Sequence, residues 1–179
     1  DTTDASGLYG FTDLAPGDLL IIDWGARYGG YLSDLTRTFA VSDIDEESTR
    51  IYEIVRRANR AGRAAGKPGT TCAQVDGAAR EVIEEAGYGS CFTHRTGHGI
   101  GREMHEEPQV PNFGLPGTGI EIRTGMVLAL EPMVNTGTWR TKVAADGWTV
   151  YTADGSLSAH FEHTVAVTAD GPEILTLPE

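Results

Sequence analysis

Cysteine and positive charge are both scarce in this chain of 179 residues. Its two cysteines, Cys72 and Cys91, are too few for a disulfide framework or a thiolate zinc cluster, although a single bridge between them stays open. We therefore expect a reduced, cytoplasmic protein. Lys and Arg number 14 against 26 Asp and Glu, a formal net charge of −12. Such an acidic chain is predicted to bind neither nucleic acid nor an anionic membrane, because both need cationic side chains.

Long apolar runs, low-complexity tracts and linker-like segments are also missing. No run is long enough to cross a bilayer, and the first residues do not have the pattern of a signal peptide. Apolar residues make up 40% of the sequence, which is enough for a hydrophobic core. Residues 1–179 are therefore predicted to form one domain.

What the sequence does contain begins with a predicted β-hairpin. Residues 18–24 and 32–41 have the composition of strands, and the Gly-Gly pair at 29–30 tolerates the positive φ angles of a tight turn. If this pair forms the loop, Asp23 lies directly opposite Thr36.

Two helices are predicted in the middle of the chain. Periodic apolar residues mark the first over 42–66, and Thr71 and Gln74 have the spacing of a capping box at the start of a second, which ends near Gly87. The Gly-rich segment 92–101 is expected to be irregular. Further strands are predicted at 126–130, 148–152 and 161–168. Strands at both ends with helices between them indicate an α+β fold.

The hairpin carries two carboxylates on one face. Asp34 lies two residues from Thr36, so it becomes a diagonal neighbour of Asp23 across the strands. Two like charges in so apolar a segment repel each other unless a cation compensates them. The open alternative is that both acids flank the turn and point into water.

Two further acids interrupt apolar segments, and one histidine lies among glycines. Glu131 follows the run 126–130, and Glu162 lies inside the predicted strand 161–168, with no Lys or Arg next to either. His98 has Gly on both sides, which leaves the imidazole open and lets other backbone approach closely. A loop histidine with an ordinary hydrogen-bonding role is the simpler alternative.

Four carboxylates and one imidazole make an oxygen-rich ligand set. Such a set suits Mn, Co or Fe, and Zn is also compatible with it. Four negative charges match two divalent cations, and a pair of cations can lower the pKa of a water molecule that attacks an amide.

At these motifs the chain resembles the family of methionine aminopeptidases, Xaa-Pro peptidases (prolidases) and creatinase, which has the pita-bread fold. Segments 23–26, 31–39 and 93–101 look like the Xaa-Pro peptidase branch. Three later segments are closer to type I methionine aminopeptidases: 105–110, 130–133 and 157–164.

The resemblance implies roles for individual residues. Metal ligands are expected at Asp23, Asp34, His98, Glu131 and Glu162. Glu131 would also move the proton of the attacking water, and His105 would hydrogen-bond the substrate carbonyl. His94 matches a substrate-side histidine of the Xaa-Pro branch, with a surface loop residue as the alternative. Trp148 matches a wall of the side-chain pocket in the methionine branch, with a core Trp as the alternative.

Two more histidines flank a predicted ligand. His160 and His163 lie on either side of Glu162 and are expected to orient it, although His163 faces the other way if the strand is regular.

The implied function is that of an exopeptidase with two divalent metal ions (Mn, Co, Fe or Zn), acting on peptide substrates. We expect Xaa-Pro cleavage with apolar first residues, and a type I methionine aminopeptidase is the alternative. A non-catalytic pita-bread module that binds a protein, and a creatinase-like hydrolase of small molecules, are further readings, and a homodimer is left open. Only residues 1–14 precede the hairpin and they contain no His, so part of the first half of the family domain is expected to be missing.

Overall fold

The computed structural model describes residues 14–111, 114–115, 117–145, 147 and 150–177. The predicted α+β class is confirmed. Its two helices are α1 (Glu46–Ala65) and α2 (Cys72–Glu85), and a short 3₁₀ helix spans Gly89–Cys91. No helix in the described part of the chain is long and apolar enough to cross a membrane.

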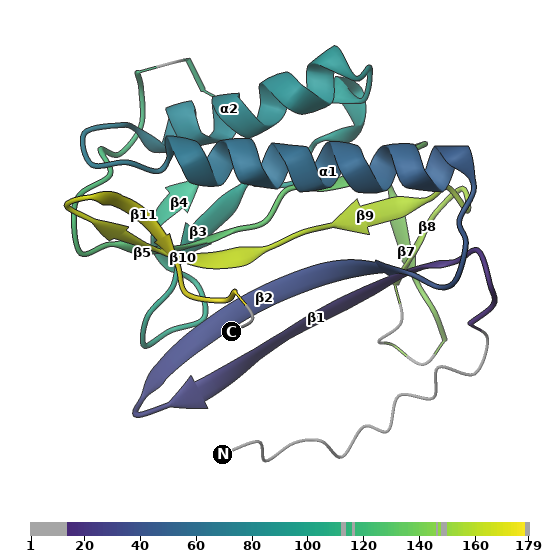
Figure 1. Cartoon of the computed structure of the whole chain (residues 1–179), viewed down its shortest axis with the longest axis horizontal. Helices are drawn as coiled ribbons and strands as arrows, with labels where there is room; N and C mark the ends of the chain where they lie inside the picture. Colours follow the sequence, from purple (N-terminus) through teal and green to yellow (C-terminus); the bar gives the residue numbers. More distant parts are fainter. Residues whose placement is uncertain (1–13, 112–113, 116, 146, 148–149, 178–179) are drawn as a thin grey trace.

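The strands of the described residues form one large sheet and three strand pairs. The large sheet is antiparallel, in the order β11-β10-β5-β3-β4, and the pairs are β1–β2, β6–β9 and β7–β8. The strand bounds are β1 Leu19–Tyr28, β2 Tyr31–Ala40, β3 Gly97–Gly99, β4 Glu106–Val110, β5 Val127–Leu130, β6 Met133–Asn135, β7 Thr141–Val143, β8 Val150–Thr152, β9 Ser158–His160, β10 His163–Thr168 and β11 Gly171–Ile174. Helices α1 and α2 lie on one side of β9 and β10, and the hairpin β1–β2 lies on the other (Figure 1).

The hairpin has the predicted register, with Asp23 opposite Thr36. Gly29 and Gly30 form the turn with φ angles of 58° and 86°, which side chains with a Cβ rarely adopt. The turn chemistry therefore decides which residues of the two strands share a face.

Threonine hydroxyls, rather than a continuous ladder, attach the hairpin to the rest of the molecule. Thr38 Oγ1 donates to His160 O at 2.8 Å and accepts from His160 N at 2.9 Å, and all of this is buried. Glu162 N donates to Thr36 O at 3.0 Å. The segment between β9 and β10 is thereby held against β2.

Both helices begin at capping residues. The Asp45 side chain accepts from Ser48 N, and the predicted capping box of Thr71 and Gln74 is present. The apolar face predicted for α1 is buried at Ile51, Ile54, Val55 and Ala58, and it packs with Phe92, Val134, Ala159 and Phe161 in one core cluster. Burial of this face holds α1 against β9, β5 and β6.

Two predictions need correction, and a third can be compared only in part. Segment 92–101 is not irregular throughout, because Gly97–Gly99 forms β3 between β4 and β5. The last predicted strand begins only at His163, because Glu162 N bonds to the hairpin instead of a neighbouring ladder. Of predicted strand 148–152, only Val150–Thr152 is described, and it forms β8.

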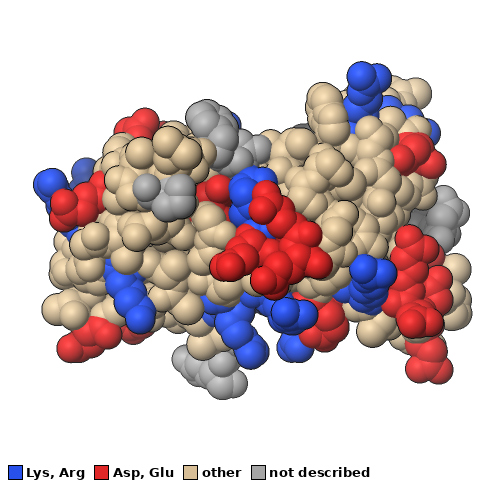
Figure 2. Space-filling view, turned by 90° about the horizontal axis from the view of Figure 1, so that it is seen from above, with Lys and Arg blue, Asp and Glu red and all other residues tan. Residues whose placement is uncertain are grey.

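The acidic surplus lies partly on the helix side of the molecule. Figure 2 shows acidic side chains gathered near the centre of this face with basic side chains around them. Charges that lie in water cost little, so such residues need no special explanation. Glu162 is different, because it is only 2% exposed.

Candidate metal centre

The two hairpin aspartates lie on one face, as predicted. Asp23 pairs with Thr36 and Asp34 with Gly25, so the carboxylates are diagonal neighbours. Asp34 is held against β10, because the Thr164 hydroxyl accepts from Asp34 N at 3.0 Å and donates to Asp34 O at 2.7 Å. Asp34 is therefore half-buried beside the large sheet, and Asp23 is exposed next to it.

A single amide on α1 holds the two strand ends that carry the glutamates. Asn59 is 2% exposed, and its Nδ2 donates to Leu130 O at 2.8 Å and to Phe161 O at 2.9 Å. These two carbonyls belong to the residues immediately before Glu131 and Glu162. Helix α1 therefore sets the spacing between the two glutamate backbones.

His98 lies in the middle of β3 and is buried, with 1% exposure. The glycines beside it do not open the imidazole to solvent, so this part of the expectation is wrong. They instead allow close approach, because a Cβ on Gly97 would overlap Ala129 O and one on Gly99 would overlap Glu107 O. His98 Nδ1 lies 2.9 Å from Gly99 O, so Nδ1 donates and the lone pair lies on Nε2.

These elements bring the five predicted ligand residues together. Ligand-type atoms of Asp34, His98 and Glu162 all lie within 4.8 Å of one another. Glu131 Oε1 lies 3.5 Å from His98 Nε2. Asp23 completes the group, because its charge raises the pKa of Asp34, Glu131 and Glu162.

Crowding and burial favour the protonated forms of these acids. Burial raises the pKa of Glu131 to about 8, with further contributions from the charges of Asp34 and Asp23. Burial and the charge of Asp34 also raise the pKa of Glu162 far above its usual range, and they outweigh the hydroxyl of Thr36, which donates to Oε2 at 2.8 Å. Divalent cations would replace these protons and remove the repulsion, so the residues present fit such cations.

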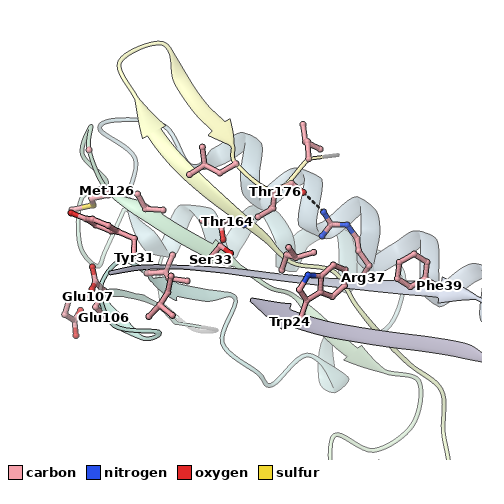
Figure 3. Close-up of a pocket in the computed structure, with 18 residues that line it drawn as sticks. Trp24, Tyr31, Ser33, Arg37, Phe39, Glu106, Glu107, Met126, Thr164 and Thr176 are labelled. Atoms are coloured by element: carbon pink, nitrogen blue, oxygen red, sulfur yellow. Dashed lines mark hydrogen bonds between the residues drawn. The ribbon is translucent and has the colours of Figure 1, made fainter. Parts of the chain in front are cut away.

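An arginine on the opposite face of the hairpin supports the Glu162 backbone. Arg37 Nη1 donates to Thr36 O and to Glu162 O, and Nη2 donates to Thr176 O at 2.9 Å. In Figure 3 this guanidinium reaches across a hollow of about 1120 Å³, with Trp24 nearby on the hairpin. Because strand side chains alternate, this hollow and the aspartates lie on different faces of the hairpin.

Of the three remaining candidate residues, His105 and His94 are described by the structure. His105 is exposed, and its ring centroid lies 4.3 Å from that of His98. His94 is half-buried, and its Nδ1 is among the buried nitrogens without a hydrogen-bond partner in the described residues. Trp148, the predicted pocket wall, lies outside the described residues.

The two histidines beside Glu162 point in different directions. His160 Nε2 lies 3.7 Å from Glu131 Oε2, so it approaches a different glutamate from the one expected. His163 turns the other way, as predicted for an alternating strand, and its Nδ1 lies 2.9 Å from Thr176 Oγ1. The difference for His160 arises because β9 pairs with β6, which begins two residues after Glu131.

A second hollow has a volume of about 510 Å³. Ile21, two residues from Asp23 on the same face of β1, lines it, and so does His94. Burial lowers the pKa of His98 and of His160, and the charge of His94 lowers both further, so His94 lies near these two rings. The other lining residues are mainly apolar and aromatic, including Met133, Trp139, Val150 and Tyr151.

Three contributors were missed from sequence: the amide of Asn59, the hydroxyl of Thr36 and the guanidinium of Arg37. The only local signal was for Asn59, a polar residue directly after Ala58 on the buried face of α1. The other two act through contacts about 125 residues away in the chain.

Known proteins with similar sequences are methionine aminopeptidases. That of Clostridium acetobutylicum is 45% identical over 166 residues, covering 93% of this chain and 66% of that protein. Methionine aminopeptidase 1 of Mycobacterium tuberculosis is 47% identical over 169 residues, covering 92% of this chain and 64% of that protein. The chain thus spans about two thirds of the length of these relatives.

Solved structures confirm the pita-bread fold. The methionine aminopeptidase of Thermotoga maritima superposes with a TM-score of 0.83 at 43% identity, covering 90% of this chain and 65% of that one. The prolidase of Pyrococcus furiosus superposes with a TM-score of 0.75 at 36% identity, covering 91% of this chain and 42% of that one. The model of metallopeptidase family M24 matches residues 2–169, and the chain belongs to this family.

Proposed function

We propose that this chain is the metal-binding catalytic domain, over residues 1–179, of a methionine aminopeptidase. The proposal of a metallopeptidase rests on the cluster of Asp34, His98 and Glu162, whose ligand-type atoms lie within 4.8 Å of one another. The choice of methionine rests on the relatives, which are methionine aminopeptidases at 45–47% identity. It replaces the Xaa-Pro preference expected from sequence, which rested on short motifs near the hairpin and His98.

Five residues would hold two divalent cations: Asp23, Asp34, His98, Glu131 and Glu162. The ligand chemistry is compatible with Mn, Co, Fe or Zn. When bound, the cations would polarise the scissile carbonyl and lower the pKa of a water molecule.

The chain's own residues supply the proton transfer and the carbonyl contact. Glu131 carries a carboxyl whose pKa burial raises to about 8, so it can accept and return a proton near neutral pH. His105 lies next to His98 at the exposed side of the cluster, where its imidazole can donate to the substrate carbonyl. Peptide substrates would therefore approach from the side of His105.

The first residue of the peptide substrate would bind in the hollow of about 510 Å³. Met133, Trp139 and Tyr151 give it an apolar wall, which suits an unbranched side chain such as that of methionine. His94 would contact the substrate from the same hollow.

The test is hydrolysis of matched peptides by the chain after removal of metal and reloading with Mn or Co. We expect kcat/KM for Met-Ala peptides to exceed that for Met-Pro and Leu-Pro peptides, since an apolar pocket selects the first residue. Faster cleavage of every Xaa-Pro peptide would assign the chain to the prolidase-like branch instead. No hydrolysis of any peptide at saturating metal would overturn the proposal.

A further inference from the structure

The two glutamates of the cluster differ in what holds their carboxylates. Glu162 Oε2 accepts a hydrogen bond from the Thr36 hydroxyl at 2.8 Å, and both residues are buried. This bond fixes the orientation of the Glu162 carboxyl group. A carboxylate that is held in this way presents a defined oxygen to a cation.

Glu131 also has a polar side chain beside its carboxylate, that of His160, but the two are not hydrogen-bonded. Its Oε1 faces His98 Nε2 at 3.5 Å, and its Oε2 faces His160 Nε2 at 3.7 Å. These separations are longer than hydrogen bonds, and within the described residues no hydrogen bond reaches this carboxylate. The two oxygens of Glu131 nevertheless face different side chains. Oε1 faces the predicted ligand His98, and Oε2 faces His160.

The Nε2 of His160 lacks a hydrogen-bond partner in the part of the chain that the structure describes, although the ring lies near the backbone of Glu131. The side chain is 9% exposed. Thr38 fixes the backbone of His160 through both N and O. A buried ring nitrogen without a partner is unfavourable, so a nearby carboxylate oxygen that can close the gap is favoured as its acceptor.

We propose that His160 is the positioning residue of Glu131. Its Nε2–H holds Oε2, so that Oε1 is directed to the side of His98, as Thr36 does for Glu162. Closing the gap needs a shift of about 1 Å, which a rotation of the flexible Glu131 side chain provides. This inference rests on the proposed function, because it assigns His160 to the metal centre of that same site.

The experiment compares variants that lose or keep a donor at this position. His160→Phe removes it in a similar volume, and His160→Gln retains an N–H donor. Cobalt titration of the metal-free chain, followed by calorimetry and by the visible absorption of the bound ion, measures affinity and ligand geometry without any need for turnover. We expect about 10–100-fold weaker cobalt binding and an altered spectrum for His160→Phe, and recovery of most of both by His160→Gln.

A double-mutant cycle separates positioning from general damage to the fold. In a Glu131→Ala background His160→Phe should cause no further loss of cobalt affinity, since its partner is gone. Equal losses in both backgrounds, an unchanged spectrum for His160→Phe, or equal damage by His160→Gln would each overturn the assignment. Should His160→Phe not fold, His160→Ala takes its place with the same expected loss. Wild-type chain that binds no cobalt would overturn the proposed function itself, and this inference with it.

Discussion

At the scale of single residues, His105 is an exposed member of the site, as Asp23 is. Its ring contacts His98 and it is exposed, whereas the residues with ligand-type atoms around Glu162 are packed against β10 and β3. A donor at the open side of the proposed metal cluster is suited to charge that develops on a substrate carbonyl, and His105 is not among the five proposed ligands.

We therefore expect His105→Ala to lower kcat about 100–1000-fold, the typical loss for one donor to a developing oxyanion. Metal content should stay at the wild-type level, and elemental analysis of the loaded variant is the control. The comparison is kcat for a Met-Ala peptide at saturating metal. An unchanged kcat would mean that His105 has no part in the reaction, and a loss of metal would make it a ligand.

At the scale of elements, β3 is the strand on which the site depends most. It carries His98 between β4 and β5, and its glycines leave no room for a Cβ. Gly97 faces Ala129 O and the Leu130 side chain, and Leu130 is also where the Asn59 amide anchors the strand end before Glu131. Crowding at this glycine would displace backbone rather than a flexible side chain.

Gly97→Ala should destabilise the chain by about 1–3 kcal/mol, the usual cost of overpacking, and should weaken metal binding by moving β3 away from β5. Gly77→Ala is the matched control. That glycine lies in α2 with nothing within 4 Å of an added Cβ, so the same change should stabilise the chain by about 0.4–1 kcal/mol. Urea unfolding of the two metal-free variants measures both effects. Shifts of the same sign and size would contradict the packing argument.

At the scale of the whole molecule, the buried carboxyls make stability depend on pH. Glu131 has its pKa raised from 4.5 to about 8, so between these values the folded chain holds a proton that the unfolded chain has released. The contribution of Glu131 to the free energy of unfolding is fully present below about pH 4.5. It is lost as the pH rises towards 8, by about 1.4 kcal/mol per pH unit. Glu162 acts in the same direction.

Buried histidines act in the opposite direction at lower pH. Burial lowers the pKa of His160 to about 4 and that of His163 to about 3, so their contribution is lost as the pH falls below 6.5. The window from pH 7 to 8 therefore isolates the carboxyls, because both histidines are mostly neutral there in either state.

We expect the Tm of the metal-free chain to fall between pH 7 and 8, and saturating Mn or Co to abolish most of this fall by taking the place of the protons. Differential scanning calorimetry at several pH values makes the measurement, and Glu131→Gln, which has no titrating group at 131, should flatten the metal-free curve. A metal-free Tm that rises over this window would show that the carboxyls are not crowded as described.

Local features of this protein were determined by its sequence alone. The Gly-Gly turn at 29–30 sets the hairpin register and so places Asp23 and Asp34 on one face, and the Thr71–Gln74 box starts α2 as predicted. Turn geometry, capping and side-chain periodicity each depend on a few neighbouring residues, so they can be recognised without the fold. Four of the five residues predicted as ligands are carboxylates in or beside apolar segments, which need compensation wherever those segments pack. Their ligand roles follow from the family resemblance and stay a prediction.

Only the tertiary structure decided how these parts are held. The Asn59 amide joins strand ends that lie 71 and 102 residues away, Arg37 reaches the Glu162 carbonyl across the hairpin, and His160 faces Glu131 instead of its neighbour in sequence. Each of these contacts depends on which elements pack against each other, and no local pattern encodes that choice. The strand β3 was missed for the same reason, because its glycines favour a loop locally and are needed only where other backbone comes within reach.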